Sequence, residues 1–174
     1  MKCPACEHEN LPGTDHCAEC HADLSDVGLP LAEDDLLAEL ASDKLSDLIP
    51  RTPVQLSPDT PVRETITRLA DSGRNCALVV RDNVLVGILT ERDILMKIAL
   101  DYEALADRPI SDFMTPNPES LGEQDNIAFG LNRMTAGDYR HVPIQEGGRP
   151  LGVVAVRDVL GYLVRRHPEQ LGTA

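Results

Sequence analysis

The sequence predicts a mixed α/β (α+β) protein built from two copies of one unit, preceded by a small cysteine-containing segment. Residues 44–166 form an internal repeat with a period of 65 residues, and four of the five cysteines lie within residues 1–22. In each copy, short apolar runs alternate with helical patterns. This alternation is typical of small sheets whose buried strands are covered by helices.

The two copies match without a gap when the sequence is shifted by 65 residues. The matched pairs include Pro53 with Pro118, Leu56 with Leu121, Gly87 with Gly152, Arg92-Asp93 with Arg157-Asp158, and Leu95 with Leu160. One copy of about 60 residues would have a poor core of its own. We therefore expect the copies to pack together with their strands facing each other.

Each copy shows the same order of elements. In the first copy, a short extended segment near 53–56 leads into a helix whose apolar face carries Val62, Ile66 and Leu69. Two apolar runs, 76–80 and 84–89, flank a turn signal. A second helix is expected to begin near Glu91.

These patterns divide the chain into four parts. Residues 1–22 hold the cysteine cluster, 44–106 form the first repeat and 107–170 the second. Residues 23–43 contain no Lys or Arg and are predicted to be an acidic linker with a short amphipathic helix, marked by Leu36, Leu37 and Leu40. A disordered tether is the alternative for this linker, because so short a helix is marginal alone.

The composition excludes several classes of function. The 29 acidic and 16 basic side chains give a net charge of −13, and there is no Trp. Such a chain lacks the charge and the stacking platforms of general nucleic-acid binders. No run approaches the ~20 apolar residues that span a membrane, and the first ten residues, MKCPACEHEN, show no secretory signal. We expect a soluble, cytoplasmic protein that binds neither membranes nor nucleic acid.

The cysteines predict a structural zinc site. Cys3, Cys6, Cys17 and Cys20 form two C-x2-C pairs that are ten residues apart, the spacing of two turns that close a tetrahedral Zn²⁺ site. The segment has almost no apolar core, so metal binding would supply its folding energy. It resembles the short zinc ribbons of prokaryotic proteins, in which Gly usually follows each pair, whereas here Glu7 and His21 do.

The segment Gly87-Ile88-Leu89-Thr90-Glu91-Arg92-Asp93 leaves an apolar run and opens a helix. Thr90 suits the N-cap, and Asp93 lies at the third helical position, which makes an aspartate version of the capping box. Taken alone, the segment predicts a helix cap.

The repeat, its extended lead-in at 53–56 and the Gly-x-x-Thr-x-x-Asp motif together resemble the CBS domain family. The resemblance covers residues 44–166, about 70% of the chain, and the two copies are similar to the tandem pair called a Bateman module. It implies two clefts related by a pseudo-two-fold axis, in which family members bind AMP, ADP, ATP or S-adenosylmethionine. It also implies a homodimer.

The resemblance assigns roles to particular residues. The hydroxyl of Thr90 and the carboxylate of Asp93 would hold the ribose hydroxyls, and Arg140 with His141 would meet the phosphate. A solvated loop is the alternative for the last two. The adenine would lie against Thr52, Pro53, Val54, Asn75, Cys76 and Ala77.

The second copy departs from the motif. It keeps Asp158 but has Ala155 where the first copy has Thr90. The cleft of the first repeat should therefore be the better site, with one strong site per chain.

These features predict a non-enzymatic regulatory protein that senses an adenine nucleotide and contacts a protein partner through its zinc ribbon. The alternative is a dimeric adaptor with empty clefts and a protein-docking ribbon. No catalytic motif and no open metal site is found in the sequence, so an enzyme is not predicted. The sequence leaves open which adenine ligand binds and which partner is regulated.

Overall fold

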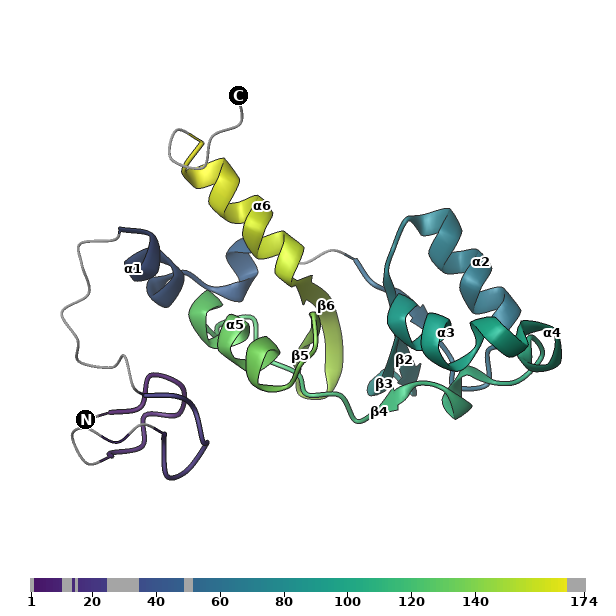
Figure 1. Cartoon of the computed structure of the whole chain (residues 1–174), viewed down its shortest axis with the longest axis horizontal. Helices are drawn as coiled ribbons and strands as arrows, with labels where there is room; N and C mark the ends of the chain where they lie inside the picture. Colours follow the sequence, from purple (N-terminus) through teal and green to yellow (C-terminus); the bar gives the residue numbers. More distant parts are fainter. Residues whose placement is uncertain (1, 11–13, 15, 25–34, 49–51, 169–174) are drawn as a thin grey trace.

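The computed structural model describes residues 2–10, 14, 16–24, 35–48 and 52–168 (Figure 1). The linker prediction for 23–43 is therefore testable only in part, because 25–34 and the side chain of Leu37 lie outside the described residues. The predicted short helix is present as α1 (Asp35–Ser42), followed by the 3-10 turn η1 (Leu45–Leu48).

The first repeat folds in the predicted order. It contains β1 (Val54–Leu56), α2 (Val62–Ser72), β2 (Cys76–Arg81), β3 (Val84–Thr90) and α3 (Glu91–Lys97). Two short pieces, η2 (Ala99–Asp101) and α4 (Tyr102–Leu105), complete it. The strands form a sheet in the order β1-β2-β3-β4, with β1 parallel to β2 and the other neighbours antiparallel.

The second repeat begins with η3 (Ile110–Asp112) and β4 (Thr115–Pro116), the latter on the edge of the first sheet. It continues with α5 (Ile127–Ala136), β5 (His141–Glu146), β6 (Arg149–Ala155) and α6 (Val156–Arg166). β5 and β6 pair in antiparallel fashion, and Leu121 bridges in parallel to Ile144 where the first repeat has β1.

Both repeats use the same hairpin with different turn residues. In the first, Asp82 and Asn83 adopt positive φ angles of 52° and 63°, and in the second Gly147 and Gly148 adopt 56° and 86°. Positive φ at both central positions is the requirement of the type I′ turn that joins twisted strands. The strand register also shifts at equivalent places, after Val79 and after Ile144.

Each repeat completes the core of the other. The amide of Leu45, ahead of the first repeat, donates to the carbonyl of Asp125 at 2.8 Å, and the amide of Ile110, ahead of the second, donates to that of Thr60 at 3.0 Å. These are the same contact shifted by 65 positions. Leu40, Leu45 and Leu48 are buried in the core of the second repeat, and Ile110 and Phe113 in that of the first.

Polar contacts also fix α1 and the residue after it on the second repeat, where α1 packs next to α5 (Figure 1). The hydroxyl of Tyr162 donates to the carboxylate of Asp43, and His167 Nε2 lies 2.8 Å from Glu39 Oε2. The helix ahead of the first repeat is therefore held by the last helix of the second.

The strands of the two repeats face each other, as predicted. Cys76, Leu78 and Ile88 of the first sheet share a buried apolar cluster with Val153 of β6. Cys76 is thus a small buried residue at the start of β2. Burial raises the pKa of its thiol to about 11.

Replacing Leu45 with alanine should destabilise the second repeat strongly. Leu45 is 1% exposed, and it lies so close to Gly130 that a Cβ there would meet its Cδ2 at 2.9 Å. A buried Leu→Ala change costs about 2–5 kcal/mol, which urea denaturation followed by circular dichroism would measure. Leu151→Ala, at a side chain 44% exposed, is the control. An equal loss of unfolding free energy in both variants would contradict the conclusion that the segment ahead of the first repeat completes the core of the second.

Candidate functional site

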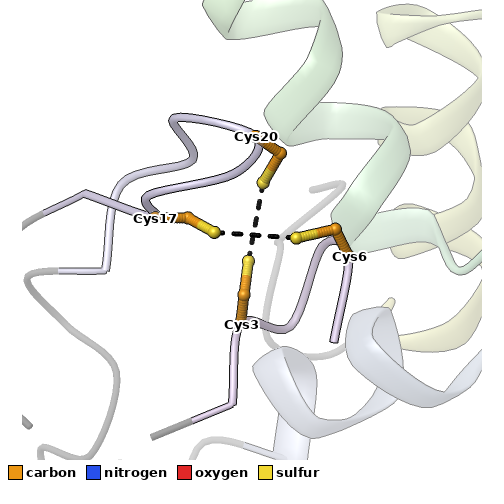
Figure 2. Close-up of side chains that lie close together, drawn as sticks. All are labelled: Cys3, Cys6, Cys17 and Cys20. Atoms are coloured by element: carbon orange, nitrogen blue, oxygen red, sulfur yellow. Dashed lines mark hydrogen bonds between the residues drawn. The ribbon is translucent and has the colours of Figure 1, made fainter. Parts of the chain in front are cut away.

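The four cysteines of the predicted zinc ribbon converge on one point (Figure 2). Their sulfur atoms all lie within 4.8 Å of one another, and Cys3 and Cys20, like Cys6 and Cys17, are 3.6 Å apart. Tetrahedral zinc with Zn–S bonds of ~2.3 Å requires sulfurs ~3.8 Å apart. The donor set and its spacing therefore fit Zn²⁺ and leave no position for a substrate.

The two cysteine pairs sit in turns of the same geometry. The amide of Cys3 donates to the carbonyl of His8 at 2.9 Å, and that of Cys17 donates to Ala22 at 2.8 Å. Glu7 and His21, which follow the pairs, have φ angles of 59° and 57°. These positions call for glycine, as the sequence indicated, because side chains disfavour this left-handed region.

Asn10 joins the two turns from inside the ribbon. Its side chain is 8% exposed. Its Oδ1 accepts from the amide of Ala18 at 2.9 Å, and its Nδ2 donates to the carbonyl of His8 at 3.0 Å and to the sulfur of Cys17 at 3.5 Å. A donor to a ligand sulfur favours the thiolate, and such contacts orient metal ligands.

The thiols do not ionise equally well. Desolvation opposes ionisation of Cys17, but the amides of Cys20 and Glu19 with the Asn10 side chain lower its pKa to about 6. At Cys6 the backbone at His8 favours the thiolate, yet desolvation and the three neighbouring thiols raise the pKa to about 12. A bound divalent cation would allow all four neighbouring thiols to ionise together, so their clustering is consistent with a metal site.

A cavity of about 770 Å³ opens between the two repeats. This volume lies within the range of ligand pockets. The predicted residues Asn75, Thr90, Asp93, Arg140 and His141 line it together. The motif of the first repeat therefore faces the loop before β5 of the second. The sequence analysis assigned no ligand contact to the other lining residues, which are Ile88, Glu91, Arg92, Thr115, Asn117, Pro118, Glu119, Asp138, Tyr139, Ala155, Val156, Arg157 and Leu160.

Thr90 and Asp93 form the capping box that the sequence predicted. The Asp93 amide donates to Thr90 Oγ1 at 3.3 Å, and Asp93 Oδ2 accepts from the Thr90 amide at 2.9 Å and from its hydroxyl at 2.6 Å. Lys97 Nζ lies 2.7 Å from Asp93 Oδ1. Burial alone would raise the pKa of Asp93, but the bonds from Lys97 and Thr90 outweigh it and hold the pKa below its usual range.

Two further lining residues of the cavity are the base His141 and Glu119, whose carboxylate is paired with a cation. Burial, and then the charge of Arg157, lower the pKa of His141, so its imidazole is neutral near pH 7. The carboxylate of Glu119 accepts from both Arg133 and the hydroxyl of Tyr139. Glu119 is thereby neutralised by a cation outside the cavity.

Four of the six other predicted residues line a second, much smaller cavity. It has a volume of about 30 Å³ and is lined by Thr52, Pro53, Cys76 and Asp158. That volume holds about two water molecules. The two cavities share four lining residues: Asn75, His141, Ala155 and Arg157. Ala77 pairs with Val54 across the sheet, and neither residue lines either cavity.

Thr52 and Pro53, which were expected to meet the same ligand as Thr90 and Asp93, thus line a different cavity from that pair. The structure places the lead-in of the first repeat beside Asp158, and the lead-in of the second, at Asn117 and Pro118, beside Thr90. The reason is the facing arrangement of the sheets, which brings the motif of one repeat to the lead-in of the other. The match of Pro53 with Pro118 was the signal that pointed to the right residues.

Comparison with known proteins identifies the fold and the class. The CBS domain family matches at residues 45–100 and again at 110–165. The chain is thus a tandem CBS domain protein, and it belongs to the CBS domain family. Within the described residues, no helix is long and apolar enough to cross a membrane.

Two curated relatives each match two thirds or more of the chain. A 17.7 kDa protein of Acidianus ambivalens is 28% identical over 74% of this chain and 78% of its own. The CBS domain-containing protein CBSCBSPB5 of Arabidopsis thaliana is 32% identical over 67% of this chain, which spans only 21% of that protein.

One similar solved structure contains a bound nucleotide. A CBS domain protein from Pyrobaculum aerophilum, complexed with AMP, is 26% identical with a TM-score of 0.61, over 71% of this chain and 99% of its own.

Replacing Glu7 with glycine should increase the zinc affinity of the ribbon. The change relieves a left-handed φ that costs a side chain about 1–2 kcal/mol, partly offset by the greater freedom of unfolded glycine. Competition with a chromophoric chelator would show tighter binding. Glu9→Gly is the control, because Glu9 has no positive φ, and it should weaken binding. A loss of affinity in Glu7→Gly would contradict the geometry of the turn.

Proposed function

We propose that this protein is a non-enzymatic regulator that binds an adenine nucleotide in the large cavity between its repeats. The main support for this proposal is that Thr90 and Asp93 of the first repeat line the same cavity as Arg140 and His141 of the second. Hydroxyl and carboxylate groups suit a ribose, and Arg suits a phosphate. The AMP complex of the relative from Pyrobaculum aerophilum supports the ligand class.

The capping box is compatible with ribose binding. Asp93 Oδ2 accepts from both the amide and the hydroxyl of Thr90, whereas Oδ1 pairs with Lys97 and keeps a further lone pair for a ligand hydroxyl. The side chain of Asp93 is 14% exposed, so it is accessible from the cavity. The cap would hold the carboxylate in place for the ribose hydroxyls.

We propose that Cys3, Cys6, Cys17 and Cys20 hold a structural zinc ion. With four sulfur ligands the ion would stabilise the ribbon and perform no catalysis. The ribbon then offers a folded surface to a protein partner. Its acidic neighbours Glu7, Glu9 and Glu19 are exposed, which argues against nucleic acid as that partner.

A homodimer would cover the exposed apolar side chains of α3 and α6. Leu95 and Met96 are 66% and 76% exposed, and Leu160 and Val164 are 58% and 39% exposed. Leu95 and Leu160 occupy equivalent positions in the two repeats. The two helices thus offer related apolar surfaces that a second copy can bury.

One observation favours the adaptor alternative. Thr90 and Asp93 form both hydrogen bonds of a capping box. A helix cap alone therefore accounts for the two side chains without any ligand. In that case the ribbon and the dimer would perform the function, and no adenine ligand would bind.

Adenine nucleotides should stabilise the zinc-loaded protein against heat, through Asp93. Ligand at 100 times its dissociation constant adds ~2.7 kcal/mol, or several degrees for a domain of this size. Asp93→Asn should abolish the shift in melting temperature. Asp158→Asn is the matched control, because Asp158 also accepts from its N-cap amide, that of Ala155, at 2.8 Å, but it lines only the small cavity.

Two results would contradict the proposal. If AMP, ADP and ATP all leave the melting temperature unchanged, the adaptor alternative is favoured. If Asp158→Asn abolishes the shift and Asp93→Asn does not, the ligand occupies the other cleft.

A further inference from the structure

Three arginines line the large cavity and form no ion pair with a described carboxylate. Within the described parts of the chain, Arg92, Arg140 and Arg157 form no ion pair. All three are exposed. By contrast, five arginines outside the cavity are paired with carboxylates: Arg63, Arg68, Arg108, Arg133 and Arg166. Four further described arginines also form no ion pair but do not line the large cavity: Arg74, Arg81, Arg149 and Arg165. The three cavity arginines are thus available to a ligand bound there.

The carboxylates of the cavity wall only partly offset these charges. Of the four acidic residues there, Asp93 is paired with Lys97 and Glu119 with Arg133, so their charges are met by cations outside the lining. Glu91 and Asp138 remain. Three arginines against two carboxylates leave a surplus of one positive charge. On a chain with a net charge of −13, this local surplus favours an anionic ligand.

The arginines approach from both repeats. Arg92 and Arg157 are equivalent residues 65 positions apart, each the second residue of its helix, α3 or α6. Arg140 precedes β5 beside His141. A single phosphate would be met by Arg140 and His141, which leaves Arg92 and Arg157 for further anionic groups.

We infer that the cavity selects a nucleoside di- or triphosphate over the monophosphate and over S-adenosylmethionine, through Arg92 and Arg157. This inference rests on the proposed nucleotide function and specifies its ligand. The sulfonium group of S-adenosylmethionine is positive and would face the surplus positive charge. Added phosphates instead bring the negative charge that the two unpaired guanidinium groups can meet with charge-assisted hydrogen bonds.

Isothermal titration calorimetry on the zinc-loaded full chain tests the inference. Adenosine, AMP, ADP, ATP and S-adenosylmethionine are compared for the natural sequence, Arg92→Gln and Arg157→Gln. Buffers contain no chelator, because a chelator would remove the zinc. Arg149→Gln is the matched control, since Arg149 is also exposed and unpaired but lies outside the cavity lining.

We expect ADP and ATP to bind at least about tenfold more tightly than AMP, as one charge-assisted bond adds ~1.5–3 kcal/mol. Each cavity variant should lose about tenfold in affinity for ATP and change little for AMP. Arg149→Gln should behave like the natural sequence.

The experiment distinguishes failure of this inference from failure of the proposed nucleotide function. If AMP or S-adenosylmethionine binds as tightly as ATP, or if the cavity variants weaken AMP and ATP equally, the inference is overturned and the nucleotide function stands. If none of the five ligands binds, the proposed function itself is overturned.

Discussion

The structure depends on the exchange of lead-in segments between the two repeats. Leu45 and Ile110 make the same backbone contact, each with the other repeat, and each brings buried apolar side chains to a core that one repeat does not fill by itself. Burying a leucine contributes about 1.5–3 kcal/mol, so the exchange stabilises both repeats. It also fixes how they face each other. Neither half is complete alone, which accounts for the pairing of two copies in one chain.

The facing arrangement creates the clefts and makes them unequal. Each cleft combines the Asp-containing motif of one repeat with the lead-in of the other. In a symmetric pair the two clefts would match, but here the substitution of Ala155 for Thr90, and of Asn75-Cys76 for Arg140-His141, breaks the symmetry. The larger cavity has the hydroxyl of Thr90 together with Arg92 and Arg140, whereas the smaller, which shares Arg157 with it, has room for about two water molecules. The two repeats thus share one fold but differ at a few equivalent positions, and the two clefts between them differ in volume.

Local patterns in the sequence were sufficient for the elements and for the cysteine cluster. The 65-residue period, the turn signals and the apolar runs predicted the order of strands and helices, and the C-x2-C spacing identified four side chains that do converge. The pairing of Thr90 with Pro118 instead of Pro53 could not be read in this way, because it follows from how two sheets pack. The contact of Asp43 with Tyr162 is hidden for the same reason, since it joins residues far apart in the sequence. That Arg92, Arg140 and Arg157 line one cavity could not be predicted either, because they are brought together from both repeats.

The most direct test of this account is a crystal structure of the zinc-loaded protein grown with ADP. The account predicts ligand density in the large cavity, with the ribose against Thr90 and Asp93, the phosphates toward Arg140, and no nucleotide beside Asp158. Density for the nucleotide in the cleft of Thr52 and Asp158, or none in either cleft at saturating ADP, would contradict it.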